Sequence, residues 1–587
     1  MICNISNSLN NQQKKAIECF EGPSIIMAGA GSGKTRVLVQ KVLYLIHDKN
    51  LEADSIVMIT FTNKAALEMK NRVEEKIGFI GTFHSFCANI LRKYGPLVGV
   101  DNNYVIYDDN DQIQLIKNIL KKYDITHFTP AYFSNKISAA KNQLIDSKRY
   151  LELFSDHNAP LVHQVYVDYT KGLRSNHAVD FDDLIMLSVE LLIKHNDVLI
   201  KYQNQYRFFL VDEFQDTNYA QYTLTRILGN KYYHVTAVGD FSQSIYSWRG
   251  ADIRNLEKFK EDFPNTTIFH LEENYRSSQN ILDFAYDIIS KNQTHPILEL
   301  YTKNPKGEEV EFVSLENEQY EAIYLTEKIK ELSINEALNS FAILYRTNAQ
   351  SRVIEESFLH SDLPYVLIGG TRFYERKEVK DVLSYLRLLI NPIDEIATDR
   401  IKKIGIRKWN VFKEMYNEIK ESVINTDSIE LMEQVFQKTG YLTQYDSDNE
   451  EDYARLENIK ELRSVAISFP NILDFLQQVA LVETEYSEGE KHNKNTHGVR
   501  LMTLHQAKGL EFKYVFIVGV EDGILPHSRS IDDIYSLEEE RRLFYVGITR
   551  AKKKLFVTYA KKRFIFGRRG ETIKSRFLGE DEEWDSV

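Results

Sequence analysis

The sequence is poor in cysteine and lacks long apolar runs. Its 587 residues include three cysteines, Cys3, Cys19 and Cys87, which lie far apart. This spacing excludes a disulfide framework and gives no ligand pattern for an iron–sulfur or zinc cluster. No apolar run approaches the roughly 18 residues of a membrane span, and residues 1–13 lack the regions of a secretion signal. We therefore expect a cytoplasmic protein with no membrane partner.

Positive charge is also in deficit, since the formal net charge is −12. This sign disfavours a nucleic-acid partner, but charges are screened beyond about 8 Å at physiological salt, so a local groove decides binding. Basic residues do gather between positions 550 and 570, although a solvated face is the usual explanation of such a run. The length predicts roughly three to five domains, and 43% hydrophobic with 27% charged residues is typical of a globular protein.

A glycine-rich segment at residues 28–35 organises the chain. It reads Ala-Gly-Ala-Gly-Ser-Gly-Lys-Thr, and it lies between the apolar run 24–27 and the helix-like stretch 36–46. In a strand–loop–helix setting, backbone N–H groups and a helix N-terminus bind a polyphosphate. Lys34 reaches the outer phosphates and the Thr35 hydroxyl can ligate Mg²⁺. Ala28 replaces the first glycine of this pattern, which is tolerable if its φ stays negative.

Two adjacent carboxylates follow a second apolar strand at residues 208–211. Asp212 and Glu213 would project from the strand's C-terminal end, where ligands bind in open α/β sheets. Asp212 is then suited to holding Mg²⁺, and Glu213 to polarising the water that attacks a γ-phosphate. Together with Lys34, this pair makes a chance glycine turn improbable.

Further strand-like runs end in side chains suited to a nucleotide or a polynucleotide. The run 55–60 leads to Phe61, and the run 234–238 leads to a segment that contains Gln243, Trp248 and Arg249. An amide can sense a γ-phosphate, and an indole beside an arginine can stack on a base. After the run 266–269 come Tyr275, suited to stacking on a purine, and Arg276, suited to pairing with a phosphoryl group. The Asp182–Asp183 pair is better explained as a helix cap than as a metal site.

A second series of strand-like runs has no glycine loop. It comprises residues 311–315, 341–345, 365–368, 499–502, 514–518 and 555–558. We expect a second α/β domain here, interrupted at about 388–497 by an acidic, helical insertion whose end, residues 488–497, reads as a flexible linker. Arg550 can complete the nucleotide site from across a cleft.

This ordered set of some eight motifs, from about residue 9 to 577, resembles superfamily 1A DNA helicases of the UvrD/Rep/PcrA type. The resemblance implies an α/β fold with two RecA-like P-loop motor domains, each a parallel sheet flanked by helices and each carrying a mainly helical insertion. The expected domains are 1–90 with 189–277 (1A), 91–188 (1B), 278–387 with 498–587 (2A), and 388–497 (a shortened 2B).

The resemblance also assigns roles to residues. Adenine is expected to meet Gln13, Arg36 and Tyr275, and the ribose Glu511. The phosphates are expected to lie against Ala28, Gly29, Ala30, Gly31, Ser32, Gly33, Lys34 and Thr35. Thr35 and Asp212 would hold Mg²⁺, and the catalytic set would be Glu213, Arg276, Arg550, Gln243 and Lys34. The DNA contacts would be Phe61, Asn63, Thr82, His84, Tyr246, Trp248, Arg249, Arg346, Asn348, His505 and Lys508.

The implied activity is an ATP-dependent 3′ to 5′ single-strand DNA translocase and helicase in repair, replication restart or recombination. It would use ATP and Mg²⁺, act on single strands and their junctions with duplex as a monomer or weak dimer, and cooperate with repair or nuclease proteins. The short 2B-like insertion leaves two alternatives: a motor subunit gated by a partner such as a nuclease in recombination or phage defence, and a translocase that strips proteins from single strands without unwinding. A small-molecule kinase is disfavoured because it needs no second domain with arginines and aromatics.

Overall fold

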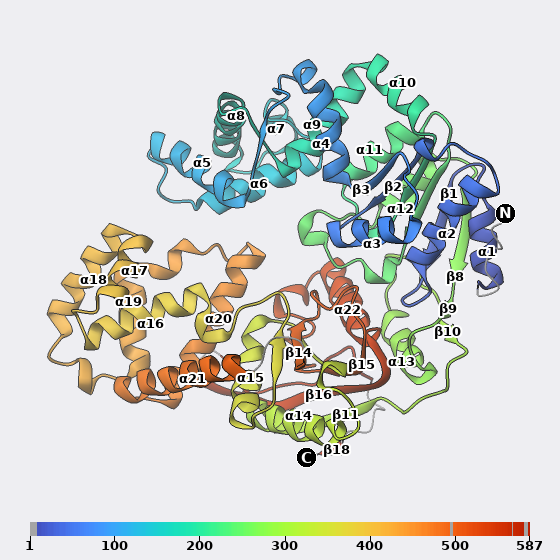
Figure 1. Cartoon of the computed structure of the whole chain (residues 1–587). Helices are drawn as coiled ribbons and strands as arrows, with labels where there is room; N and C mark the ends of the chain where they lie inside the picture. The colour runs from blue at the N-terminus through green and yellow to red at the C-terminus, as the bar shows by residue number, and fades with distance from the viewer. Residues whose placement is uncertain (1–8, 493–496, 566–567, 580–584, 587) are drawn as a thin grey trace. The chain divides into compact units, whose positions relative to one another are not determined.

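The computed structural model describes residues 9–492, 497–565, 568–579 and 585–586. The chain forms two compact units. The first unit contains Met1–Arg276 and Asn292–Lys303, and the second contains Ser277–Lys291 and Asn304–Val587. The chain therefore passes from one unit to the other three times (Figure 1). The division into four domains stays a prediction.

A six-stranded parallel sheet lies at the centre of the first unit. The strand order is β3-β2-β6-β7-β1-β8. The bounds are β1 Ser24–Ala28, β2 Ile56–Thr60, β3 Phe79–Thr82, β6 Phe208–Val211, β7 Val235–Gly239 and β8 Thr267–Leu271. Because all strands run parallel, their carboxyl ends meet at one edge. The parallel sheet and its predicted strands are confirmed, and β3 is an addition that the sequence did not show as a strand.

Helices cover both faces of this sheet, since alternate strand residues point to opposite sides. Ile26, Met58 and Leu210 belong to one core with α1 (Asn11–Glu18), α2 (Lys34–His47) and α3 (Asn63–Val73). Their neighbours Ile25, Val57 and Phe209 belong to a second core. That core includes residues of α4 (Phe83–Tyr94), α9 (Phe181–Lys194), α10 (Asn196–Gln205), α11 (Tyr219–Gly229) and α12 (Asn255–Asp262).

Residues 105–180 include a separate, mainly helical group. Its elements are β4 (Val105–Tyr107), α5 (Asp109–Lys122), α6 (Pro130–Asn142), α7 (Tyr150–Leu153), α8 (Ala159–Ser175) and β5 (Ala178–Asp180). They share their own apolar core, and β4 pairs with β5 in parallel. The cap of α9 is Asp180, which accepts from the Asp183 N–H, whereas Asp183 itself pairs with buried Lys141. The expectation that Asp182 and Asp183 form the cap is therefore wrong by position, because a third carboxylate takes that place.

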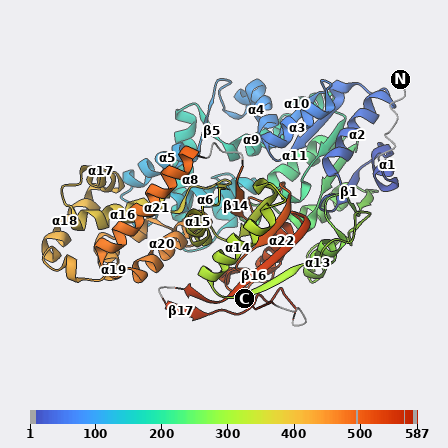
Figure 2. The ribbon, with the colours of Figure 1, turned by 60° about the horizontal axis from the view of Figure 1, so that its bottom comes forward.

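The second unit contains another sheet whose strands pair in parallel, with one antiparallel addition. The order is β13-β14-β12-β15-β16-β11-β18, with β17 antiparallel to the long strand β16 (Figure 2). The bounds are β11 Glu311–Asn317, β12 Phe341–Tyr345, β13 Tyr365–Leu367, β14 Val499–Thr503, β15 Phe512–Ile517, β16 Ala551–Ile565, β17 Arg568–Glu571 and β18 Asp585–Ser586. All six predicted strands of this series are present. Helices α13 (Gln279–Ile289), α14 (Glu318–Ser333), α15 (Ser351–His360) and α22 (Ile534–Ile548) accompany them.

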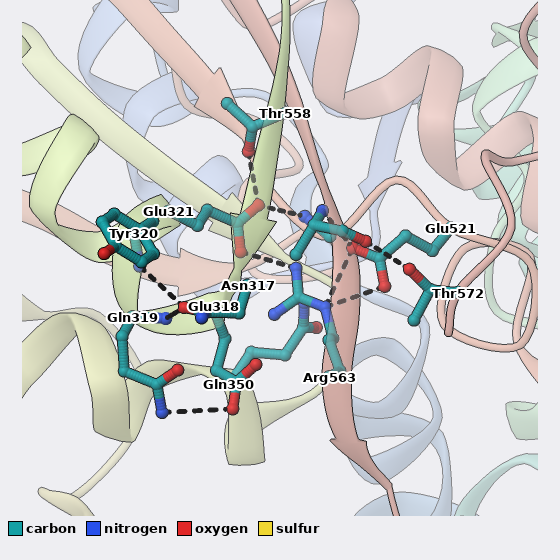
Figure 3. A network of polar contacts seen from close by, with 12 residues as sticks. Asn317, Glu318, Gln319, Tyr320, Glu321, Gln350, Glu521, Thr558, Arg563 and Thr572 are labelled. Atoms are coloured by element: carbon teal, nitrogen blue, oxygen red, sulfur yellow. Dashed lines mark hydrogen bonds and ion pairs between the residues drawn. The ribbon is translucent and has the colours of Figure 1, made fainter. Parts of the chain in front are cut away.

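A buried ionic network fixes part of this second sheet. Figure 3 shows the Arg563 guanidinium between the carboxylates of Glu321 and Glu521, at 2.5 Å and 2.8 Å. Glu321 also accepts from the Thr558 hydroxyl, and Glu521 accepts from the Ala560 N–H. Burial works to lower the pKa of Arg563, but the two carboxylates together raise it above its usual value. The network thereby ties α14, on which Glu321 lies, to strand β16.

Six helices form the insertion of the second unit. They are α16 (Lys377–Ile390), α17 (Glu395–Ile404), α18 (Ile406–Ile419), α19 (Ser428–Thr439), α20 (Glu450–Ser468) and α21 (Ile472–His492), and they share one apolar core (Figures 1 and 2). The helical character is confirmed. The expected flexible linker at 488–497 is wrong in its first half, since α21 continues to His492, and residues 493–496 lie outside the described part of the chain.

Within the described ranges, no single helix combines the length and the apolar character of a membrane span. Helix α20 and the part Ile472–Val482 of α21 meet that criterion only when taken together, and the chain bends by 119° between them. Ile459, Leu462 and Phe475 of this pair lie buried in the core of the insertion.

Candidate functional site

The phosphate loop lies at the carboxyl edge of the first sheet. Strand β1 ends at Ala28, and Gly31 and Gly33 have φ values of 66° and 85°, which side chains other than glycine rarely adopt. A Cβ on Gly31 would come within 2.7 Å of the Asn274 amide nitrogen, so this glycine is also needed for close approach. Ala28, which replaces the first glycine of the pattern, is extended as the last residue of β1 and has no positive φ, as an alanine at this position requires.

The loop is preformed by its own hydrogen bonds. The Ser32 N–H and hydroxyl both donate to the Gly29 carbonyl, at 3.2 Å and 2.7 Å. Helix α2 begins directly afterwards, at Lys34, so the first-turn N–H groups and the positive end of the helix dipole lie at the loop. Ala30 completes this segment as a buried residue. The arrangement suits a polyphosphate.

Two acids lie at the end of β6. The Lys34 Nζ atom is 3.8 Å from Oε2 of Glu213, so the phosphate loop and the acids belong to one site. Burial raises the pKa of Asp212 to about 7, and the neighbouring charge of Glu213 acts in the same direction, while Lys34 lowers it.

The residues here fit a magnesium ion. The Asp212 Oδ1 atom is buried and has no hydrogen-bond partner, which is unusual for a buried carboxylate oxygen. A divalent cation would satisfy it and would favour its charged form. Thr35, in the first turn of α2, offers the hydroxyl that the sequence pattern pairs with such an acid.

A γ-phosphate sensor was predicted at Gln243, which lies after β7. Gln243 closes the short helix η4 (Phe241–Gln243) and is buried, and its amide donates to the Asp240 carboxylate at 2.7 Å. Burial raises the pKa of Asp240, opposed by the charge of Lys34. Phe241, which comes before Gln243 in this short helix, is buried in the apolar core of the first unit.

The segment that follows β8 is hydrogen-bonded to the phosphate loop. The Asn274 amide donates to the Ala30 carbonyl at 2.7 Å, and the Tyr275 N–H donates to the Gly31 carbonyl at 3.0 Å. The Arg276 N–H donates to the Asn274 side chain at 2.7 Å. Arg276 is therefore held beside the loop by its backbone, as a phosphate-binding role requires.

The predicted adenine-binding residues lie on the same side of the loop. Gln13 accepts from the Asn10 N–H at 3.1 Å and donates to the Ser32 carbonyl at 2.9 Å. A Gln amide has a second N–H and a second lone pair, so these bonds leave capacity for a base. Tyr275 is 46% exposed, and its hydroxyl accepts from Asn10, while Arg36 lies exposed in the first turn of α2. Asn10, which the sequence did not single out, thus orders both Gln13 and Tyr275.

An exposed aromatic cluster lies beyond strands β2 and β7. The rings of Phe61 and Tyr246 are stacked, with centroids 6.1 Å apart and planes 8° apart. Trp248 lies edge-on to Tyr246 and is 42% exposed, and the Arg249 guanidinium lies 4.5 Å from the Trp248 ring centroid. Asn63 is exposed at the start of α3 nearby in sequence. Exposed rings beside a cation are suited to stacking on bases.

Thr82 and His84 lie at the start of α4. The Thr82 hydroxyl caps this helix by accepting from the Ser85 N–H. The His84 ring lies edge-on to Phe181, with centroids 5.9 Å apart, and burial lowers its pKa. Phe181 is 46% exposed and was not predicted, because a single phenylalanine next to acidic residues has no distinctive sequence pattern.

The remaining predicted residues lie in the second unit. Arg346 forms a two-pronged pair with Glu540, at 2.7 Å to 3.0 Å, and is only slightly exposed. Lys552 pairs with Glu511. Asn348 begins the short helix η7 (Asn348–Gln350), and His505 and Lys508 follow β14, all three partly exposed.

Arg550 is buried and donates within its own unit. Its Nε donates to the Val546 carbonyl at 2.9 Å, Nη1 to the Leu510 carbonyl at 3.2 Å, and Nη2 to the Thr549 hydroxyl at 3.0 Å. Carbonyls are weaker partners for a guanidinium than a phosphate is. The role of Arg550 at the γ-phosphate stays a prediction.

Comparison with known proteins covers nearly the whole chain. The UvrD/REP helicase N-terminal domain matches residues 9–264, and the UvrD-like helicase C-terminal domain matches residues 269–440 and 402–562. The chain is similar to the ATP-dependent DNA helicase PcrA of Staphylococcus epidermidis, with 40% identity over 98% of this chain and 86% of the relative. It is also similar to PcrA of Staphylococcus aureus, with 39% identity over the same shares. The matched residues include the phosphate loop, the paired acids and the aromatic cluster. The chain belongs to the UvrD/REP helicase family, and it is a helicase of the UvrD/PcrA type in superfamily 1A.

Proposed function

We propose that this enzyme is an ATP-dependent DNA helicase that moves 3′ to 5′ along single-stranded DNA. One observation carries the proposal. In the first unit, a single segment, residues 240–250, runs from the acids of the phosphate site to the partly exposed ring of Tyr246 and the exposed ring of Trp248. A nucleotide site and a base-stacking surface that share one segment can act on each other directly.

ATP binds the phosphate loop in this proposal. The N–H groups of Ala30, Gly31, Gly33 and the first turn of α2 would face the phosphates, and Lys34 would pair with the outer ones. Gln13 and Arg36 hold the adenine edge, Tyr275 stacks on the ring, and Glu511 contacts the ribose. Mg²⁺ held by Thr35 and Asp212 would neutralise charge on the β- and γ-phosphates.

Glu213 acts as the general base. It lies within 3.8 Å of Lys34, so its carboxylate is near the end of the phosphate site, and it would accept the proton of the attacking water. Gln243 and Arg276 sense the γ-phosphate from the first unit. Arg550 stabilises the same group from the second unit when the two units close on the nucleotide, which makes hydrolysis wait for that movement.

Single-stranded DNA lies on the aromatic cluster. Stacking contributes about 1–3 kcal/mol per base, enough to hold a strand and weak enough to release it at each step. Phe61, Tyr246 and Trp248 supply the rings. The other proposed contacts are Asn63, Thr82, His84, Arg249, Arg346, Asn348, His505 and Lys508.

Each unit would be one motor domain with its own insertion, divided at the residues given above. The separate apolar cores of the two helical groups support one insertion in each unit, although α9 and α16 each continue across a proposed boundary. Junctions of single strand and duplex would be the natural substrates, in repair, replication restart or recombination, in the cytoplasm and as a monomer or weak dimer.

Strand displacement tests this proposal. Duplexes with a 3′ tail, with a 5′ tail and with blunt ends would be incubated with the protein, ATP and Mg²⁺, beside a single-strand translocation assay. We expect displacement of the 3′-tailed duplex alone, and none by the Glu213→Gln variant. Equal displacement of both tailed duplexes would contradict the polarity.

The short 2B-like insertion that the resemblance implies favours a second possibility. Unwinding can then depend on a partner such as a nuclease, or be absent. Translocation without displacement would support a protein that strips other proteins from single strands. Displacement that appears only when a partner is added would support a gated motor subunit.

A further inference from the structure

Gln215 lies two residues after Glu213 and is almost fully buried, in the short helix η3 (Phe214–Asp216). The side chain uses both ends of its amide. Its nitrogen donates to Oε2 of Glu213 at 2.6 Å, and its oxygen accepts from the Asp240 N–H at 3.0 Å. A single amide therefore connects the end of β6 with the end of β7.

The bond to Glu213 fixes the direction of a carboxylate. Glu213 has a φ of 50°, a left-handed backbone that costs of order 1–3 kcal/mol and persists only where neighbours hold it. The Gln215 amide donates to the same oxygen that faces Lys34. Since the amide is neutral, it orients the carboxylate while leaving its negative charge, which a base needs, in place.

The bonds to the other side hold the segment after β7. Beyond the contact of the side chain with Asp240, the main-chain carbonyl of Gln215 accepts from the Ser244 hydroxyl at 3.1 Å. Asp240 in turn accepts from Gln243 at 2.7 Å. A Cβ on Gly239 would lie 2.4 Å from the Gln215 amide oxygen, so strand β7 presses closely on this amide and leaves it no room to shift.

The same segment ends in the aromatic cluster. The Arg249 and Ala251 N–H groups both donate to the Tyr246 carbonyl, which makes the turn compact. Tyr246 stacks on Phe61, and Trp248 and Arg249 lie beside it. A base that stacks there acts on a segment whose other end, at Asp240 and Ser244, is bonded to Gln215.

We propose that Gln215 is a positioning residue: it orients Glu213 for hydrolysis and ties that orientation to the 240–250 segment that DNA contacts. The inference rests on the proposed function, since it needs an ATPase that DNA stimulates. It differs from a purely structural role, in which Gln215 would only satisfy buried polar groups. In that case its loss lowers stability and leaves the rate of the folded enzyme unchanged.

The test compares Gln215→Met with a matched control, Gln221→Met. Gln221 is also a buried glutamine of the first unit, and it caps α11 by accepting from the Asn218 N–H. For each full-length variant, kcat and KM for ATP are measured with and without an oligothymidine, together with the affinity for that oligonucleotide. We expect Gln215→Met to lower kcat with DNA about 10- to 100-fold, with KM and DNA affinity within about twofold of wild type. Gln221→Met should retain kcat.

A second variant guards against loss of folding. Gln215→Glu keeps an acceptor for the Asp240 N–H but replaces the donor to Glu213 by a repelling carboxylate, and it should lower kcat in the same way. In a Glu213→Gln background, Gln215→Met should have no further effect on residual hydrolysis, because both changes remove one function.

Three outcomes would overturn the proposal: wild-type kcat in folded Gln215→Met, additive losses in the double variant, or unfolding of both Gln215 variants by circular dichroism. Failure of the proposed function gives a different result. In that case the wild-type protein itself shows no stimulation by the oligonucleotide.

Discussion

The two sheets share a parallel architecture but treat their buried acids in opposite ways. In the first unit, Asp212, Glu213 and Asp240 lie near Lys34, and Asp212 keeps a buried oxygen without a hydrogen-bond partner. In the second unit, Glu321 and Glu521 share Arg563. The acids of the first group outnumber the cation beside them and one carboxylate oxygen has no hydrogen-bond partner, whereas both carboxylates of the second group pair directly with Arg563.

This difference distinguishes a ligand-binding site, the first group, from an ionic network that stabilises the fold, the second group. A metal and a polyphosphate would complete the charge balance of the first group, so its unfavourable electrostatics are relieved only when substrate is present. The second group has nothing left to bind. The same direct pairing of an acid with an arginine occurs elsewhere in the second unit, between Arg346 and Glu540 and between Arg352 and Glu461. A second nucleotide site is therefore not expected at these acids.

The largest effect should come from the acid that we assign to catalysis. Glu213→Gln removes the base and should lower kcat for ATP by about 10²- to 10⁴-fold while ATP still binds. Steady-state hydrolysis and a fluorescent-nucleotide titration measure the two quantities. Retention of most activity would place the base elsewhere.

The same chemical change in the second sheet should affect folding instead. Glu521→Gln replaces the charged acceptor of the Arg563 Nε–H by a neutral one while Glu321 remains, so we expect the free energy of unfolding to fall by about 1.5–3 kcal/mol. Denaturant unfolding of wild type and variant measures this loss. If Glu521→Gln left stability intact but abolished hydrolysis, the conclusion that the acids of the second sheet stabilise the fold and do not take part in hydrolysis would be wrong.

A smaller effect concerns pH. Because the pKa of Asp212 is raised from 3.8 to about 7 in the folded protein, the folded state holds a proton that the unfolded state releases near pH 4. The associated stability is present below pH 4 and is lost as pH rises to 7. The Asp212→Asn variant has no such titrating group, so its stability should not fall in this pH range. The free energy of unfolding of the variant minus that of wild type, measured without nucleotide or metal, should therefore increase by about 2–3 kcal/mol between pH 5 and pH 8. A difference that stays constant over this range would contradict the raised pKa of Asp212.

The smallest effect should come from the aromatic cluster. Trp248→Ala removes one stacking surface and should weaken binding of single-stranded DNA by about 1–3 kcal/mol. A fluorescence-anisotropy titration with an oligothymidine measures this change. Tyr233→Ala provides the control, because Tyr233 is an exposed tyrosine of the first unit that lies outside the cluster. Equal losses in both variants would mean that Trp248 has no special role.

Local patterns predicted the parts of the site that are contiguous in sequence. The phosphate loop, its flanking strand and helix, and the acids at 212–213 are each specified by neighbouring residues, so glycine placement and apolar runs sufficed. The strands of both sheets followed for the same reason. The short strand β3, which contains Gly81 and Thr82, has less apolar character and was not predicted.

Contacts between distant residues could not be predicted in this way. The Gln215 side chain accepts a hydrogen bond from the Asp240 N–H, and Arg346 forms an ion pair with Glu540, 194 positions away. Likewise, Lys141 forms ion pairs with both Asp180 and Asp183, and Asp180 is also the residue that caps α9. Each of these depends on which elements pack together, information that a residue's own neighbours in sequence do not contain.

The central claim is that one site at the edge of the first sheet hydrolyses ATP under control of a polynucleotide on the adjoining aromatic cluster. The most direct measurement is steady-state ATP hydrolysis by the wild-type protein across a titration with single-stranded DNA. The account predicts at least about tenfold stimulation that saturates with DNA, in keeping with a base whose alignment contributes orders of magnitude. Hydrolysis at one constant rate across the whole titration would contradict it.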